Sequence, residues 1–86
     1  MAKRDKLLDS IRANPKAVRF ENACKVAERL GFIHKGGQGS HRAFGRPSEP
    51  ELLNFQNRGG YIPPYQARQL VRMIDKYGEQ NGEVSD

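Results

Sequence analysis

Tryptophan is absent from this chain of 86 residues, cysteine occurs once, and hydrophobic residues make up only 36%. The single thiol, Cys24, excludes an internal disulfide and a zinc site of several cysteines, and its place on an apolar helix stripe predicts packing. No hydrophobic run approaches the roughly 20 residues that span a membrane, and the N-terminus shows no signal-peptide core. We therefore expect a soluble cytoplasmic protein of one small domain, without membrane contact, metal or cofactor.

Positive charge is concentrated in the first half of the chain. The net charge is +5; residues 1–46 contain 11 Lys and Arg against 4 Asp and Glu, whereas residues 47–86 contain 4 against 6. Such an excess favours an anionic partner, with nucleic acid as the first candidate and an acidic protein as the second. A solvated helix face is the commoner explanation for any single lysine, so charge alone identifies no partner.

Hydrophobic spacing predicts three helices, over residues 3–13, 20–30 and 64–77. The dipeptide Asn14-Pro15 ends the first, because a proline disfavours α-helical geometry in the preceding residue. Gly31 follows the second at the left-handed position that often ends a helix, and Pro64 suits the first turn of the third. The chain is thus expected to divide into an N-terminal helical extension, a domain and a polar tail, over residues 1–15, 16–78 and 79–86.

Between the second and third helices, hydrophobic residues alternate, which predicts strands over residues 32–35, 40–46 and 52–57. Short turns at residues 36–39 and 47–50 separate them, and such turns imply antiparallel neighbours. The predicted fold class is therefore α+β, with a three-stranded antiparallel sheet, two helices packed on one face and the N-terminal helix added. The other face of the sheet is left to solvent and is the place to look for function.

Strand alternation assigns side chains to the two faces. Phe44 belongs to the core, which places Arg42 on the same side near its rim and turns His41 outward. Leu53 and Phe55 are predicted to point inward from the third strand. The uncovered face is then expected to carry Ile33, Lys35, His41, Ala43, Gly45, Leu52, Asn54 and Gln56. Its small residues would let a bulky anionic chain approach closely.

A histidine titrates near neutrality, at an unperturbed pKa of about 6.5, and can therefore act as a general base or acid. Attack of a ribose 2′-hydroxyl on the adjacent phosphate needs proton transfer, in-line geometry and positive charge near the phosphate oxygens. His41 with Lys35, Arg42 and Arg46 meets this minimum. A solvent-exposed histidine without a chemical role is the alternative. His34 is expected on the core side or at the sheet edge, in a structural role, and no third ligand accompanies the two histidines to form a metal site.

Three other features have both a structural and a functional explanation. The glycines of residues 36–39 are expected to supply the positive φ of a tight hairpin, and they resemble a phosphate cradle only loosely. Tyr61 and Tyr65 are expected to pack under the third helix, with base stacking as the alternative. That helix also carries a basic stripe, either a solvated face or a track for a phosphate backbone, made of Arg68, Arg72 and Lys76.

The segment RFENACKVAERLGFIHKGGQGSHRAF, residues 19–44, resembles the HicA family of toxins from bacterial and archaeal type II toxin-antitoxin modules. That family combines a helix ending in Leu-Gly-Phe or Leu-Gly-Trp, a short strand with a basic residue, then Gly-Ser-His and an aromatic. The matching positions here are Leu30-Gly31-Phe32, Lys35, Gly39-Ser40-His41 and Phe44. Residues 52–78, LLNFQNRGGYIPPYQARQLVRMIDKYG, are similar to the branch in which a glycine-rich segment leads through Pro-Tyr-Gln into the last helix.

This resemblance implies a fold like that of double-stranded-RNA-binding domains and a metal-independent endoribonuclease that cleaves mRNA. It also implies a cognate HicB-type antitoxin protein that binds the toxin and covers the histidine face. The histidine of Gly-Ser-His carries over as catalytic and falls on His41. No other residue carries over; charge and proximity to His41 make Lys35, Gly39, Ser40, Arg42 and Arg46 the expected RNA contacts. Many members of the family have a second histidine where this chain has Arg42.

Two other functions fit the same residues. One is a non-catalytic RNA-binding module that uses this sheet face or the basic stripe. The other is a subunit that docks a partner within a regulatory complex. RNA cleavage that depends on His41 distinguishes the toxin hypothesis from both.

Overall fold

The computed structural model describes residues 6–78. Its elements are, in order, α1 (Lys6–Ala13), α2 (Phe20–Arg29), β1 (Ile33–Gly36), β2 (His41–Arg46), β3 (Glu49–Gln56), α3 (Pro64–Met73) and the π-helical turn η1 (Ile74–Gly78). The order and type of the three predicted helices and three predicted strands are confirmed. The polar tail expected over residues 79–86, and the first residues of the expected N-terminal helix, lie outside the described part.

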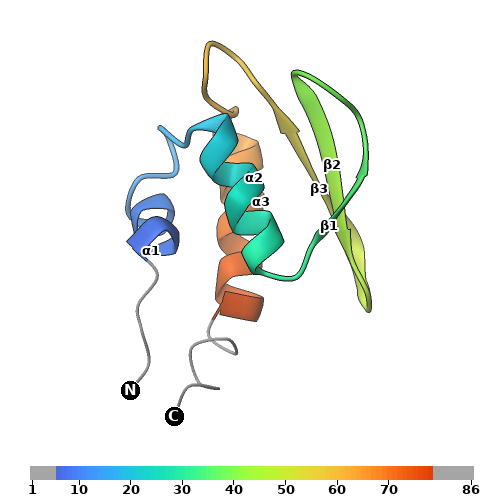
Figure 1. The fold of residues 1–86 in the computed structure, drawn as a ribbon. Coiled ribbons are helices and arrows are strands. Elements are labelled where there is room, and N and C mark those ends of the chain that lie inside the picture. The colour runs from blue at the N-terminus through green and yellow to red at the C-terminus, as the bar shows by residue number, and fades with distance from the viewer. Residues whose placement is uncertain (1–5, 79–86) are drawn as a thin grey trace.

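The three strands form one antiparallel sheet in the order β1-β2-β3. Helices α2 and α3 lie side by side against one face of this sheet, and α1 lies beyond them (Figure 1). The opposite face of the sheet is not covered by any element of residues 6–78 (Figure 1). The structure is therefore α+β, with its helices on one side of the sheet. The helical and two-residue spacings of hydrophobic residues in the sequence predict this arrangement.

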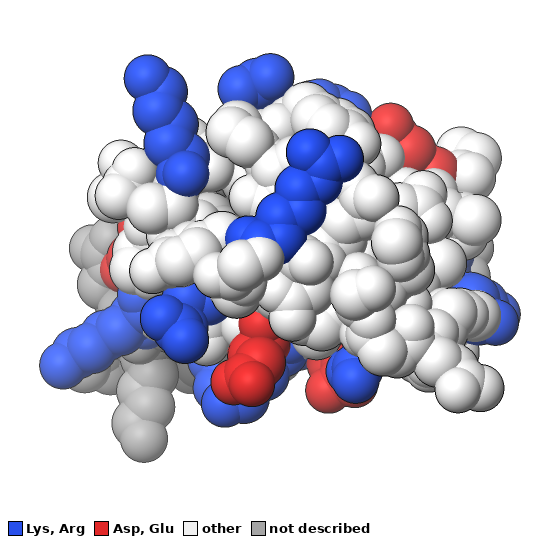
Figure 2. All heavy atoms as spheres, turned by 90° about the horizontal axis from the view of Figure 1, so that it is seen from above, with Lys and Arg blue, Asp and Glu red and all other residues white. Residues whose placement is uncertain are grey.

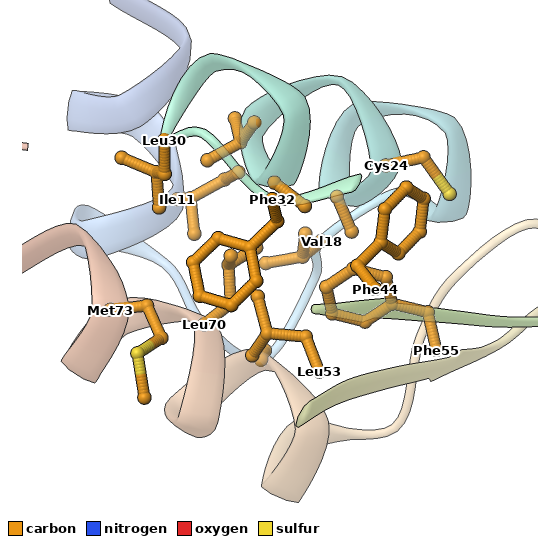
Figure 3. Packing of buried hydrophobic residues seen from close by; sticks show 14 of the residues in the cluster. Ile11, Val18, Cys24, Leu30, Phe32, Phe44, Leu53, Phe55, Leu70 and Met73 are labelled. Atoms are coloured by element: carbon orange, nitrogen blue, oxygen red, sulfur yellow. The ribbon is translucent and has the colours of Figure 1, made fainter. Parts of the chain in front are cut away.

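The core lies between the sheet and the helices. Phe44, Leu53 and Phe55 point inward from the sheet, and none of them is more than 1% exposed. Figure 3 shows them in one cluster with side chains from the helices, where each large buried apolar residue contributes about 1.5–3 kcal/mol. Ile11 of α1 belongs to the same cluster at 3% exposure. The N-terminal helix therefore completes the core of the domain.

Strand β3 begins at Glu49, whereas the sequence predicts a start at residue 52. Arg46 pairs with Glu49, so the turn consists of Pro47 and Ser48 alone. Ser48 has a φ of 73°, and proline followed by a positive φ is the combination expected of a type II turn. The register shifts between Phe44 and Arg46 to accommodate the additional residues, and β3 tolerates a proline because it is an edge strand.

A buried carboxylate connects this hairpin to the π-helical turn η1. The side chain of Glu49 is only 3% exposed and accepts hydrogen bonds from Lys76 Nζ at 2.7 Å, from the Tyr77 hydroxyl and from the backbone N–H of Glu51 at 3.0 Å. The bonds from Lys76 and Tyr77 lower the pKa of Glu49 from 4.5 to about 2. The ionised form of Glu49 therefore contributes to the stability of the folded state.

We expect the substitution Glu49→Gln to lower the melting temperature at neutral pH and to weaken its dependence on acid pH. The pKa of Glu49 is lower in the folded state, so its contribution is complete above about pH 4.5 and is lost as the pH falls toward about 2. Thermal unfolding followed by circular dichroism at about pH 6 and about pH 3 measures the difference. The control is Glu51→Gln, because Glu51 pairs with Arg72 at the surface. Equal acid sensitivity of the wild type and Glu49→Gln would contradict this account.

Candidate functional site

His41 is the first residue of β2, and its side chain lies exposed on the uncovered face of the sheet. It pairs across the strands with Gln56, the last residue of β3. The imidazole Nε2 is 2.8 Å from Gln56 Nε2, and Nδ1 is 3.4 Å from the Ser40 hydroxyl. Both ring nitrogens therefore have a neighbour, and the orientation of the ring is defined.

These contacts assign the tautomer of the neutral imidazole. Arg58 Nη2 donates a hydrogen bond to Gln56 Oε1 at 3.2 Å, which leaves the amide nitrogen of Gln56 facing His41. An amide nitrogen only donates, so His41 Nε2 accepts and the ring proton lies on Nδ1, where it faces Ser40 Oγ. The basic nitrogen of His41 is thus Nε2, on the side of Gln56.

Two loops meet at this end of the molecule and bring Arg58 to the site. The backbone N–H of Asn57 donates to the carbonyl of Ser40 at 2.8 Å, which joins the turn before β2 to the loop after β3. That loop closes on itself through a hydrogen bond of 2.7 Å from Arg58 N to Tyr61 O. Viewed from above, this end is mostly uncharged surface from which Lys and Arg side chains project, with acidic side chains toward its margins (Figure 2).

A hollow of about 390 Å³ lies beside His41, within the range of about 300–1,000 Å³ common for ligand sites. Gly36 and Ala43 contribute small residues to its lining, Gln56 contributes an amide, and Tyr65 contributes an aromatic ring from α3. Among the described residues, no aspartate or glutamate lines it. The hollow is therefore suited to an anionic ligand that also has a flat or apolar part.

Gly37 shapes the backbone next to His41. Its φ is 85°, and a Cβ at this position would lie 2.4 Å from the carbonyl oxygen of His41. Gly39 also has a positive φ, of 64°. The turn requirement predicted for these two glycines is confirmed. For Gly36 the prediction is wrong, because it lies in β1 without a left-handed φ and with open space where a Cβ would be.

The structure brings some of the predicted RNA-contacting residues together and separates others. Gly39 and Ser40 directly precede His41. Lys35 lies on the same uncovered face, but its side chain runs over Gly45, with Cγ and Cε each 3.2 Å from the position of a Gly45 Cβ. Gly45 is four residues farther along β2 than His41, so the Lys35 side chain adds positive charge to another part of this face.

Arg42 and Arg46 belong to the opposite, helix-covered face. The Arg42 guanidinium lies 5.5 Å from the ring centre of Phe20, which confirms its predicted place at the rim of the core. Arg46 Nε donates to the carbonyl of Leu30 at 2.8 Å, and its guanidinium stacks 4.0 Å from the ring centre of Tyr77. Neither guanidinium lies on the face that carries His41, although Arg42 also borders the hollow. Arg46 joins β2 to α2 and η1.

The tyrosines of the loop and helix do not pack as expected. Tyr61 is 41% exposed and Tyr65 is 58% exposed, so the prediction that both pack under the last helix is wrong.

His34 and Cys24 lie where the sequence predicts. His34 is at the sheet edge, and its ring centre is 5.5 Å from the ring centre of Phe44. Cys24 is buried, and burial raises the pKa of its thiol, which agrees with packing.

The basic stripe of the last helix is largely paired within the molecule. Arg72 Nη2 lies 3.2 Å from a carboxylate oxygen of Glu51, and Lys76 Nζ lies 2.7 Å from Glu49. Both carboxylates belong to β3, which runs past α3 and η1. A phosphate backbone that followed this stripe would have to compete with these two ion pairs.

Comparisons of this chain with protein-family models, curated proteins and solved structures find no match. Within residues 6–78, no helix has the length and apolar character needed to cross a bilayer. The same described part contains no cluster of three or more His, Cys, Asp or Glu residues placed to hold a metal ion.

We expect Gly37→Ala to destabilise the fold and displace His41, whereas Gly36→Ala should leave both nearly unchanged. Alanine at residue 37 would combine a left-handed φ, which costs about 1–3 kcal/mol, with a contact of 2.4 Å to the His41 carbonyl. Residue 36 has neither constraint. Thermal unfolding and the amide NMR shift of His41 measure the two effects. Equal behaviour of the two variants would show that Gly37 does not shape the site.

We expect Gln56→Leu to abolish the preference of His41 for the tautomer protonated at Nδ1. Leucine has a similar size but lacks the amide that donates to Nε2. Imidazole ¹⁵N chemical shifts, recorded at a pH where the ring is neutral, report the tautomer directly. Asn54→Leu is the matched control, because it removes an exposed amide from the same strand face. An unchanged ratio of tautomers in Gln56→Leu would refute the role assigned to this bond.

Proposed function

We propose that this chain is a HicA-type toxin, a metal-independent endoribonuclease that cleaves mRNA in the cytoplasm and is neutralised by a HicB-type antitoxin. Its fold would then be of the double-stranded-RNA-binding type. The supporting observation is that His41 lies exposed on the uncovered sheet face, with its ring oriented on both sides and a hollow without acidic side chains next to it. The sequence resemblance points to the same histidine.

The geometry supports a role for His41 as the general base. A ribose 2′-hydroxyl that takes the place of the Gln56 amide would meet the lone pair of Nε2 and give up its proton there. The 2′-oxygen then bonds to the adjacent phosphorus as the bond from phosphorus to the 5′-oxygen breaks, and the leaving oxygen takes a proton from water. The products are a 2′,3′-cyclic phosphate and a 5′-hydroxyl.

Positive charge for the phosphate comes from residues that share this end or this face. Arg58 is exposed and already contacts Gln56, the neighbour of His41. Lys35 adds a cation on the same face. These two residues replace Arg42 and Arg46, whose guanidinium groups lie over Phe20 and Tyr77.

Exposed apolar side chains on the same face support a protein partner. Ile33 is 54% exposed and Leu52 is 46% exposed, and Leu52 Cδ2 lies 2.9 Å from the position of a Gly45 Cβ. Ile33 pairs with Gly45 across the strands, so the two apolar side chains flank one glycine. Exposed apolar clusters of this kind are typical of interaction sites, and an antitoxin bound there would also cover His41.

We expect His41→Ala to lose RNA cleavage while remaining folded. A positioned general base contributes about 10²- to 10⁴-fold to a rate, and His41 is exposed, so its truncation leaves the core intact. The assay is incubation of the purified protein with end-labelled single-stranded RNA in EDTA, alongside growth of cells that express each variant. His34→Ala, the other histidine of the chain, is the control.

Two results would overturn the proposal. Cleavage at the wild-type rate by His41→Ala would exclude the histidine. A shifted RNA band without fragments for the wild type, with an affinity that falls as salt rises, would instead identify a non-catalytic RNA-binding module.

A further inference from the structure

The hollow beside His41 has an aromatic ring in its lining that the proposed cleavage step does not use. Tyr65 belongs to the first turn of α3, and more than half of its surface is exposed. It lines the hollow together with His41, although the two residues come from different elements and are far apart in the sequence. An exposed tyrosine facing a hollow has a flat apolar surface available to a ligand.

Tyr65 is held in place through the edge of the sheet. The backbone N–H of Gln56, at the end of edge strand β3, donates to Gln66 Oε1 at 2.8 Å. The amide oxygen of Gln66 is therefore occupied, and its nitrogen donates to the Tyr65 hydroxyl at 3.4 Å. Gln66 is only 5% exposed, so this link is part of the packed structure. Gln56 thus supports both His41, through its side chain, and Tyr65, through its backbone.

The lining of the hollow defines the chemistry of its ligand. Small residues, Gly36 and Ala43, leave room for a flat group, and Asn54 pairs with Ala43 across the strands and presents an exposed amide to the same space. An amide can pair with the hydrogen-bonding edge of a heterocycle while an aromatic ring stacks on its face. The lack of acidic residues among the described lining residues permits a phosphate nearby.

We propose that Tyr65 is the stacking platform for a nucleobase of single-stranded RNA whose neighbouring phosphate lies at His41, with Asn54 meeting the edge of that base. A base within a duplex has its faces covered by its neighbours, so this site selects unpaired RNA. The assignment rests on the proposed function for the position of the phosphate. The stacking itself does not require that the RNA be cleaved.

The test measures binding in a protein that cannot cut its ligand by the proposed route. In the His41→Ala background, we expect Tyr65→Ala to raise the Kd for a single-stranded oligoribonucleotide by about 5- to 150-fold. Tyr65→Phe should keep most of the affinity, because it retains the ring. The probe is a twelve-nucleotide RNA with one 2-aminopurine, whose fluorescence also changes when the base stacks. Tyr61→Ala is the matched control, because Tyr61 is an exposed tyrosine that does not line the hollow.

The outcomes separate this inference from the proposed nuclease. Unchanged affinity of Tyr65→Ala, or equal losses in Tyr65→Ala and Tyr65→Phe, would overturn the stacking role even if the wild type cleaves RNA. If Tyr65→Ala loses affinity while Tyr65→Phe does not, and the wild type leaves RNA intact, the base site would be supported and the proposed nuclease function would be rejected. An equal effect of Tyr65→Ala on a duplex of the same sequence would overturn the selection for unpaired RNA.

Discussion

The burial of Phe44, Leu53 and Phe55 against α2 and α3 is the constraint on which the rest of the structure depends. Successive side chains of a strand point to opposite faces, so these three residues determine the face on which each neighbouring side chain lies. His41 and Gln56 must then lie on the uncovered face, as a facing pair at the ends of their strands. A slip of one residue would send both into the core, and the hydrophobic burial opposes that slip strongly.

Features with a local cause could be predicted from the sequence. The alternation of hydrophobic residues predicts the faces of β2 and β3, and Gly31 after the second helix has the expected positive φ of 92°. Features that join distant segments could not. Glu49 contacts Tyr77, which is 28 residues away in the sequence, and no short sequence motif predicts that contact. The start of β3 at Glu49 could not be predicted either, because Pro50 indicates a turn unless the strand is known to lie at the edge of a sheet.

The candidate site could be predicted only in part, because several of its contacts also join segments that are distant in the sequence. Strand parity predicts that His41 is exposed, and the structure places Arg46 on the side of Phe44, bound to Leu30. Its positive charge led us to predict an RNA contact, and in the structure the guanidinium stacks on the ring of Tyr77. Tyr65 was expected to pack under the third helix, but it is 58% exposed. The buried position beside it is filled instead by Gln66, which satisfies a backbone N–H at the open edge of β3.

That edge explains how a small domain can support a site without a deep core. The last residue of β3 pairs with His41 on one side only, so its backbone N–H and its side-chain amide can bond to groups outside the strand ladder. Gln56 uses its N–H to hold Gln66, its amide nitrogen to orient His41 and its amide oxygen to accept from Arg58. Three elements are thereby joined at one residue. The imidazole and the aromatic ring are consequently linked through Gln56 and Gln66, so displacement of β3 would disturb the proposed proton transfer and the proposed base binding together.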